Sequence, residues 1–441
     1  MRPLNFVSAD EAVSVVKPHD HIHISSAAHV PFILIEALCR RADAGELEDI
    51  HFHHSYTEGP ALYADPKYKG IFIDQAFFVG PTVRPSVNLG IADYIPVHLA
   101  ETQKLYRSGA VKCDVAMVSV STPGMGGYVS LGGSVDCSVA ALEVAKIKIA
   151  VVNRYVPHTY GDALIPIDTF DYFVEDNRPL PEYLSMIPSE VEKQIGKNIS
   201  ERIDDGSCLQ LGIGALPDAL AFFLRDRRDL GIHTEMFSAG VLELMKMGVV
   251  TGANKKIDRG RVVASFLLGT QDFYEYVDFN RSILMMDIGY VNDPYVIARN
   301  PKVVAINSAV QIDLTGQISA DSIGTRIISG TGGQLDFVKG ATMSEGGKSI
   351  TAFPSRAKNG QSKIVPILDE GAGVVTPRAD AHWVVTEYGA VNLTGLSLQE
   401  RAKALIGIAH PNDREGLEKA AFIRFRHPSF IDNTKRKIDK I

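Results

Sequence analysis

The sequence is poor in cysteine and tryptophan, with four cysteines and one tryptophan among 441 residues. No two of the cysteines are separated by only two residues, so neither a paired-thiolate zinc site nor a disulfide framework is indicated. Cysteines that neither form disulfides nor bind metal are typical of proteins in a reducing compartment. We therefore expect four buried thiols and a cytoplasmic protein.

Basic charge and long apolar segments are also lacking. The formal net charge is −7 and the isoelectric point is near 6.0, so no electrostatic attraction to nucleic acid or to an anionic membrane is indicated. No stretch approaches the roughly 18 apolar residues of a membrane-spanning helix. The first residues also lack the apolar core of a signal peptide. We expect neither nucleic acid nor membrane as a partner.

Apolar runs that alternate with amphipathic segments define the fold class. Residues 114–120 and 148–152 are nearly continuous apolar runs, which are typical of parallel strands covered on both faces. The segment 32–38 has a helical pattern and follows Pro31, and we expect a further strand over 261–268. Strands that alternate with helices predict an α/β fold with mainly parallel sheets. The length is too great for one ordinary core and predicts two domains.

The two halves of the chain open with a similar pattern. Residues 20–38 and 205–224 each run from an aspartate through a strand and a small-residue loop to a proline and an apolar helix. This loose repeat predicts two similar open α/β domains. The segment 153–182 is rich in proline, aspartate and tyrosine and has little periodicity. We place the domains at 1–185 and 186–441.

One carboxylate has an unusual sequence neighbourhood. Glu235 lies in the segment 231–240, between apolar or small residues, which predicts the end of a strand at the mouth of a sheet. Glycine-rich segments lie on either side in sequence, at 210–217 and 330–337. A partly desolvated carboxylate is a good nucleophile, and glycines let backbone amides approach an oxyanion. A solvent-exposed or helix-capping glutamate is the alternative.

Other site types have weaker support. The segment 210–217 resembles the start of a dinucleotide-binding loop, with Glu235 where a ribose-binding acid would fall, but Pro217 replaces the third glycine. Histidines gather at His21/His23 and at His51/His53/His54, without carboxylates or thiols at ligand spacing, so we predict no metal site. No G-x-S-x-G motif supports a serine hydrolase.

The chain resembles the acetyl-CoA hydrolase/transferase family of class I CoA-transferases, and within it the 4-hydroxybutyrate and butyryl-CoA:acetate branches. The resemblance extends over nearly the whole chain and is carried by segments 77–84, 114–120, 126–132, 210–217, 233–236, 313–317, 330–341, 385–389 and 401–411. It implies two α/β domains with the active site at their interface. The loop 121–127 lacks an acidic residue found in many relatives, so the acceptor acid is not fixed.

The resemblance also assigns residues. It makes Glu235 the catalytic nucleophile, and the CoA contacts that it implies are Gln210, Leu211, Gly212, Ile213, Gly214, Val310, Gly332, Gly333 and Lys358. Coenzyme A and acyl-CoA are then substrates, short carboxylic acids are the other partners, and no tightly bound cofactor or metal is needed. The family also implies a homo-oligomer, such as a dimer.

The activity implied is transfer of CoA between a short-chain acyl-CoA (acetyl-, butyryl- or 4-hydroxybutyryl-CoA) and a free carboxylate, through a glutamyl-CoA thioester. The first alternative is an acyl-CoA hydrolase of the same family, in which water reaches the Glu235 adduct. An NAD-dependent dehydrogenase and a non-catalytic CoA-binding protein are alternatives from other classes.

Overall fold

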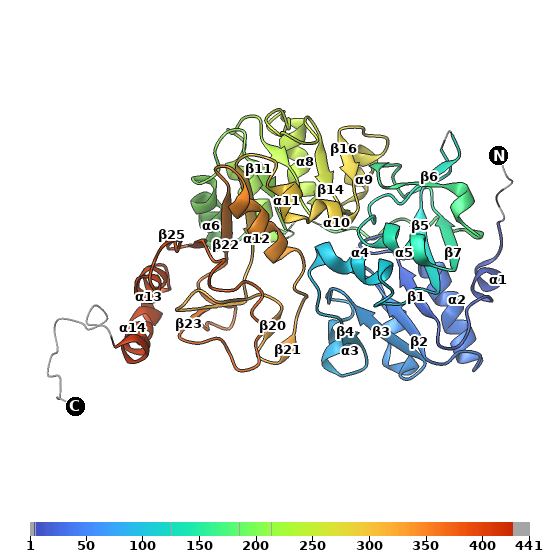
Figure 1. The fold of residues 1–441 in the computed structure, drawn as a ribbon, viewed down its shortest axis with the longest axis horizontal. Coiled ribbons are helices and arrows are strands. Elements are labelled where there is room, and N and C mark those ends of the chain that lie inside the picture. Colours follow the sequence, from blue (N-terminus) through green and yellow to red (C-terminus); the bar gives the residue numbers. More distant parts are fainter. Residues whose placement is uncertain (1–3, 5, 125, 185, 213, 427–441) are drawn as a thin grey trace.

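A seven-stranded parallel sheet forms the first half of the protein (Figure 1). The computed structural model describes residues 4, 6–124, 126–184, 186–212 and 214–426. The strands lie in the order β10-β7-β5-β1-β2-β3-β4, and every neighbouring pair is parallel. They are β1 (His21–Ile24), β2 (Ile50–His53), β3 (Phe72–Ala76), β4 (Asp93–Tyr94), β5 (Val115–Val120), β7 (Ile147–Val152) and β10 (Tyr172–Glu175).

Helices cover both faces of this sheet. The helices are α1 (Ala9–Val13), α2 (Phe32–Asp43), α3 (Arg84–Asn88), α4 (Leu99–Arg107) and α5 (Ser138–Val144). Alternate residues of β5 point to opposite cores: Val115 and Met117 pack with α1 and α2, whereas Ala116 and Val118 pack with α5. This two-sided burial explains why β5 and β7 are apolar throughout.

The second half contains a six-stranded sheet in the order β12-β11-β17-β22-β24-β25, in which only the last pair is antiparallel. Its strands are β11 (Cys208–Gln210), β12 (Gly231–Ile232), β17 (Val303–Asn307), β22 (Lys348–Ala352), β24 (Trp383–Thr386) and β25 (Gly389–Asn392). Its helices are α6 (Glu190–Ser200), α7 (Ala215–Phe223), α8 (Ala239–Lys246), α9 (Gln271–Val277), α10 (Ile288–Val291), α11 (Pro294–Ile297), α12 (Gln334–Met343), α13 (Leu398–Gly407) and α14 (Pro411–Phe425).

The two sheets share one strand order, which confirms the predicted similarity of the halves. In the first sheet, β1 lies between β2 on one side and β5-β7-β10 on the other. In the second sheet, β11 lies in the same way between β12 and β17-β22-β24. The predicted strand–loop–helix repeat is also present, as β1 followed by α2 and β11 followed by α7. The division at 185/186 stays a prediction.

Short strands complete the fold and join the halves. They are β6 (Tyr128–Ser130), β8 (Tyr160–Gly161), β9 (Leu164–Pro166), β13 (Met236–Ser238), β14 (Val262–Ala264), β15 (Phe266–Leu268), β16 (Ile283–Met285), β18 (Gln311–Asp313), β19 (Ile318–Ser319), β20 (Ser322–Ile323), β21 (Arg326–Ile327) and β23 (Ile364–Val365). Because β8 pairs with β16, a strand from the first half extends a sheet of the second.

The predicted strand over 261–268 is wrong as a single element. It is divided into β14 and β15, which belong to different sheets. The division falls at Ser265, whose amide donates to the carbonyl of Glu235 at 2.9 Å and whose carbonyl accepts from Val135 and Asp136. Ser265 therefore forms hydrogen bonds to Glu235, between β12 and β13, and to the first half instead of continuing one ladder.

All four cysteines are free and buried, as expected from the sequence. Among the described residues, no helix is both long enough and apolar enough to cross a membrane.

Candidate active site

Glu235 lies at the carboxyl end of β12, immediately before β13. Its carbonyl accepts hydrogen bonds from the amides of Ser265 at 2.9 Å and Phe266 at 3.1 Å. The preceding residues His233 and Thr234 are buried. The backbone is therefore fixed, and the partly buried side chain of Glu235 is held at the edge of the sheet where α/β proteins bind ligands.

Two neighbours contact the carboxylate directly. The side-chain amide of Asn292 donates to Oε2 of Glu235 at 2.7 Å, and Asn292 is fully buried after α10. A Cβ atom on Gly333 would lie 2.0 Å from the same oxygen. Only glycine therefore fits at position 333, because any other side chain would overlap the carboxylate.

The environment raises the pKa of Glu235 from its ordinary value of 4.5 to about 7. Burial is the largest cause, and the charge of Asp336 adds to it. Hydrogen bonds from Asn292 and from the backbone of Gly333 act in the opposite direction and stabilise the carboxylate. A carboxylate that is poorly solvated yet still ionisable near neutral pH suits a nucleophile.

Asp336 is a second buried acid at the site. It lies in the first turn of α12, and its Oδ2 accepts a hydrogen bond from the amide of Ala100 in α4 at 3.2 Å. Burial raises its pKa to about 6, whereas hydrogen bonds from Ala100 and Asn292 lower it. Asn292 thus lowers the pKa of both Glu235 and Asp336.

The second glycine segment, 330–333, is attached to the first half of the protein. The hydroxyl of Tyr94 accepts from the amide of Thr331 at 2.8 Å, and the carbonyl of Gly332 accepts from the amide of Leu99 at 3.1 Å. Phe78 packs so closely on Gly330 that a Cβ there would lie 3.0 Å from its ring. The candidate site therefore lies between the two halves.

The first glycine segment presents its backbone to open space. Gln210 ends β11, and its side-chain oxygen accepts from the amide of Ile306 at 3.1 Å. A Cβ on Gly212 or Gly214 would have no neighbour within 4 Å. Gly214 has a φ of +114°, which favours glycine, and precedes α7. A ligand could approach these peptide groups closely.

These segments enclose a cavity of about 340 Å³. Six of the residues assigned from the sequence line it together: Gln210, Gly212, Glu235, Val310, Gly332 and Gly333. Leu211 and Gly214 adjoin the cavity in sequence without lining it, and Lys358, which is exposed in a turn, does not line it either. Ile213 lies outside the described residues.

Sequence reasoning missed two members of the site. Asn292 lies 57 residues after Glu235, in a segment with no recognisable motif. Asp336 lies in the segment 330–337, where only the glycines indicated a site. Both act through tertiary contacts, so a single sequence carries no local signal for them.

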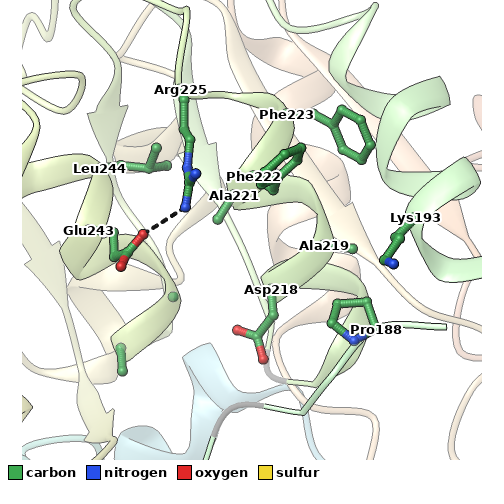
Figure 2. Close-up of a pocket in the computed structure, with 12 residues that line it drawn as sticks. Pro188, Lys193, Asp218, Ala219, Ala221, Phe222, Phe223, Arg225, Glu243 and Leu244 are labelled. Carbon is green, nitrogen blue, oxygen red and sulfur yellow. Dashed lines mark hydrogen bonds and ion pairs between the residues drawn. The ribbon is translucent and has the colours of Figure 1, made fainter. Parts of the chain in front are cut away.

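A second cavity of about 660 Å³ lies between α6, α7 and α8. Figure 2 shows Phe222 and Phe223 on α7, with Arg225 paired to Glu243 at 3.0 Å across the opening. None of the residues assigned from the sequence lines this second cavity.

The histidine clusters are held by hydrogen bonds. Nδ1 of His21 lies 2.9 Å from Nε2 of His53, and His23 contacts the hydroxyls of Tyr106 and Ser138. His54 pairs with a buried aspartate. Within the described part of the chain, no group of three or more histidine, cysteine, aspartate or glutamate side chains could hold a metal ion.

The fold has two sheets of the same strand order, and a partly buried glutamate lies beside two glycine segments. This arrangement suits an enzyme of covalent acyl transfer. The comparisons define the class further. The model of the acetyl-CoA hydrolase/transferase N-terminal domain matches residues 3–183, and that of the C-terminal domain matches residues 269–421. The chain belongs to this family.

Two relatives illustrate the likeness. The chain is 45% identical to a succinyl-CoA:acetate/propanoyl-CoA:succinate CoA transferase of Fasciola hepatica, over 95% of this chain and 88% of the relative. It is 43% identical to a 4-hydroxybutyrate coenzyme A transferase of Clostridium kluyveri, over 93% and 96%. The crystal structure of RipA from Yersinia pestis superposes with a TM-score of 0.90 at 37% identity, over 96% of this chain and 98% of that one.

One more distant relative is named as a hydrolase. An acetyl-CoA hydrolase of Yarrowia lipolytica is 24% identical over 77% of this chain and 72% of the relative. The predicted family and its transferase branch are therefore confirmed. The dinucleotide-binding alternative loses its support, because it needs Glu235 to bind a ribose. Oε2 of Glu235 instead accepts a hydrogen bond from Asn292 and lies against Gly333.

Proposed function

We propose that this protein is an acyl-CoA:carboxylate CoA-transferase that acts through a covalent thioester between Glu235 and CoA. The observation that carries the proposal is the carboxylate of Glu235, which faces a cavity lined by two glycine segments and is bonded to Asn292. The names of the relatives support the same activity.

In the first step, an oxygen of Glu235 attacks the thioester carbonyl of the acyl-CoA. The carbon–sulfur bond breaks, CoA leaves as a thiolate, and an acyl–glutamyl anhydride remains. The developing oxyanion needs hydrogen-bond donors that are already in place. Backbone amides of the segments at Gly212 and Gly333 are suited to this task, because both lie at the cavity wall.

In the second step, the thiolate attacks the side-chain carbonyl of Glu235 and releases the first carboxylic acid. The resulting glutamyl-CoA thioester keeps the energy of the original thioester. An acceptor carboxylate then attacks it, and the same two steps run in reverse to release a new acyl-CoA. Binding along the CoA chain can stabilise the closed arrangement at the reacting end.

Water competes with the acceptor acid at both intermediates, so the site must exclude it. The hydrogen bonds of Thr331 and Gly332 to the first half close one wall of the cavity. This closure favours transfer over hydrolysis. The hydrolase alternative predicts that the protein releases CoA from acetyl-CoA without any acceptor acid, at a rate comparable with transfer.

The proposal is tested by trapping the intermediate. The protein is incubated with acetyl-CoA, reduced with borohydride and analysed by peptide mass spectrometry. A glutamyl thioester is reduced to an alcohol, so the peptide with Glu235 should lose one oxygen and gain two hydrogens. Glu235→Gln is the matched control and should stay unmodified. An unmodified wild-type peptide during measurable turnover would rule out Glu235 as the nucleophile.

The proposed substrates are short acyl-CoAs, with acetyl-CoA as one partner and butyrate, 4-hydroxybutyrate or succinate among the acceptor acids. The names of the relatives motivate this choice. A screen of free acids at fixed acetyl-CoA would rank them by kcat/KM. A strong preference for aromatic or long-chain acids would contradict the proposal.

We also propose that the protein acts in the cytoplasm as a homodimer. The four free, buried cysteines agree with a reducing compartment. Light scattering coupled to gel filtration would test the assembly, and a monomeric mass at working concentration would contradict it.

A further inference from the structure

Two arginines from different halves of the protein lie side by side without acidic partners. Arg84 begins α3, and Arg326 begins β21, which lies against α3 in Figure 1. The side-chain amide of Asn88 donates both to the carbonyl of Arg84, at 2.9 Å, and to that of Ile327, at 2.7 Å. One asparagine thus fixes the two segments to each other.

Neither guanidinium is neutralised. Within the described part of the chain, neither the Arg84 nor the Arg326 side chain makes a hydrogen bond or an ion pair, and Nε of Arg84 is buried without a partner. Burial is the largest cause and lowers the pKa of Arg84, Tyr56 raises it, and the charge of Arg326 lowers it by a smaller amount. Two like charges and an unpaired buried donor are unfavourable unless an anion binds there.

The arginines lie on segments that lead out of the candidate active site. Phe78 and Ile328 both line the cavity that contains Glu235. The chain reaches Arg84 six residues after Phe78, and Arg326 comes two residues before Ile328. Arg326 is exposed and Arg84 is half-buried, so the pair lies at the surface on segments that lead to the cavity wall.

We propose that Arg84 and Arg326 together bind a phosphate group of CoA, an inference that rests on the proposed function. In CoA the thiol and the phosphates are at opposite ends of the pantetheine arm. A molecule whose thioester reaches Glu235 must therefore leave its phosphates at a distance from it, nearer to solvent. Arginine binds phosphate oxygens through a planar fork of donors, and such charged hydrogen bonds are among the stronger ones.

The experiment uses Arg84→Gln, Arg326→Gln and the double variant of the full-length protein. Arg228→Gln is the matched control, because Arg228 is exposed and its side chain has no hydrogen bond or ion pair to the described residues. Melting temperatures are compared first. Each variant is then assayed with acetyl-CoA and with acetyl-pantetheine, which lacks the nucleotide phosphates. Affinity for adenosine 3′,5′-bisphosphate is measured by calorimetry.

We expect each substitution to raise KM for acetyl-CoA about tenfold or more, with a much smaller change in kcat. Affinity for the bisphosphate should fall to a similar degree. KM for acetyl-pantetheine and for the acceptor acid should stay within about twofold of wild type, and Arg228→Gln should match wild type throughout.

Two results would overturn the inference. If the substitutions raised KM for acetyl-CoA and acetyl-pantetheine equally, the arginines would not contact phosphate. If they raised only KM for the acceptor acid, the pair would bind the carboxylic substrate. A wild type that bound the bisphosphate through these arginines, yet transferred no CoA, would instead refute the proposed function alone.

Discussion

The contact between Asn292 and Glu235 makes a quantitative prediction. Asn292→Ala removes the donor that lies 2.7 Å from Oε2 of Glu235. A hydrogen bond to a charged group contributes about 1.5–3 kcal/mol, and one pKa unit corresponds to about 1.4 kcal/mol. The pKa of Glu235, about 7 in the wild type, should therefore rise by about one to two units.

The proposed nucleophile is the ionised form of Glu235, so the effect of Asn292→Ala on kcat/KM depends on pH. At pH 7 the ionised fraction should fall from about one half to between about one tenth and one hundredth, which lowers kcat/KM roughly 5- to 50-fold. Toward pH 9 the variant should recover much of the wild-type rate. The measurement is kcat/KM for acetyl-CoA from about pH 6 to about pH 9.

Asn307→Ala is the matched control, because Asn307 lines the same cavity and no hydrogen bond joins it to Glu235 among the described residues. Asn307→Ala should leave the acid limb of the plot of kcat/KM against pH at the same pH as in the wild type. The reasoning would be refuted if the acid limbs of Asn292→Ala and wild type coincided, since Glu235 would then not be the group that titrates.

Three further predictions follow from glycine geometry and buried charge. Gly212→Ala places a methyl group in open space, so the variant should fold normally but have a kcat/KM lowered more than about tenfold. Gly333→Ala should lower kcat/KM and also the melting temperature, because its Cβ would lie 2.0 Å from Oε2 of Glu235. The raised pKa of Glu235 means that its contribution to stability is present below about pH 4.5 and lost as the pH rises through about 7. The melting temperature of Glu235→Gln should thus exceed that of wild type by more at pH 8 than at pH 5. Asp74→Asn removes the fully buried partner of His54, at 2.8 Å, and should cost about 3–5 kcal/mol in chemical denaturation; a cost below about 1 kcal/mol would contradict a charged pair.

Much of the fold and part of the site were predictable from local patterns. Strands buried on both faces, such as β5, must be apolar at every position, and this leaves a clear signal in one sequence. Glycine-rich segments such as 210–217 and 330–337 also leave a signal, whereas the assignment of Gly212 and Gly333 as CoA contacts came from the family resemblance. Strand β13, by contrast, has three residues and leaves almost none.

The remaining features depend on contacts between distant segments. The break at Ser265 could not be predicted, because 261–268 has the composition of one strand and its division follows from hydrogen bonds to Glu235 and Asp136. Asn292 resembles any polar residue at a helix end until its contact with Glu235 is known. Tertiary partners determine such positions, and local propensity does not.

The repeated topology explains why the reacting groups meet where they do. In the second half, Glu235 follows β12, and β12 pairs with β11, the strand that leads into the glycine segment at 210–217. The first half supplies Phe78, which packs on the segment 330–333, and Tyr94 and Leu99, which hydrogen-bond to it. A single α/β half would leave the carboxylate open to water on one side. The second half therefore supplies the proposed nucleophile, and contact with the first half supplies the enclosure that transfer without hydrolysis requires.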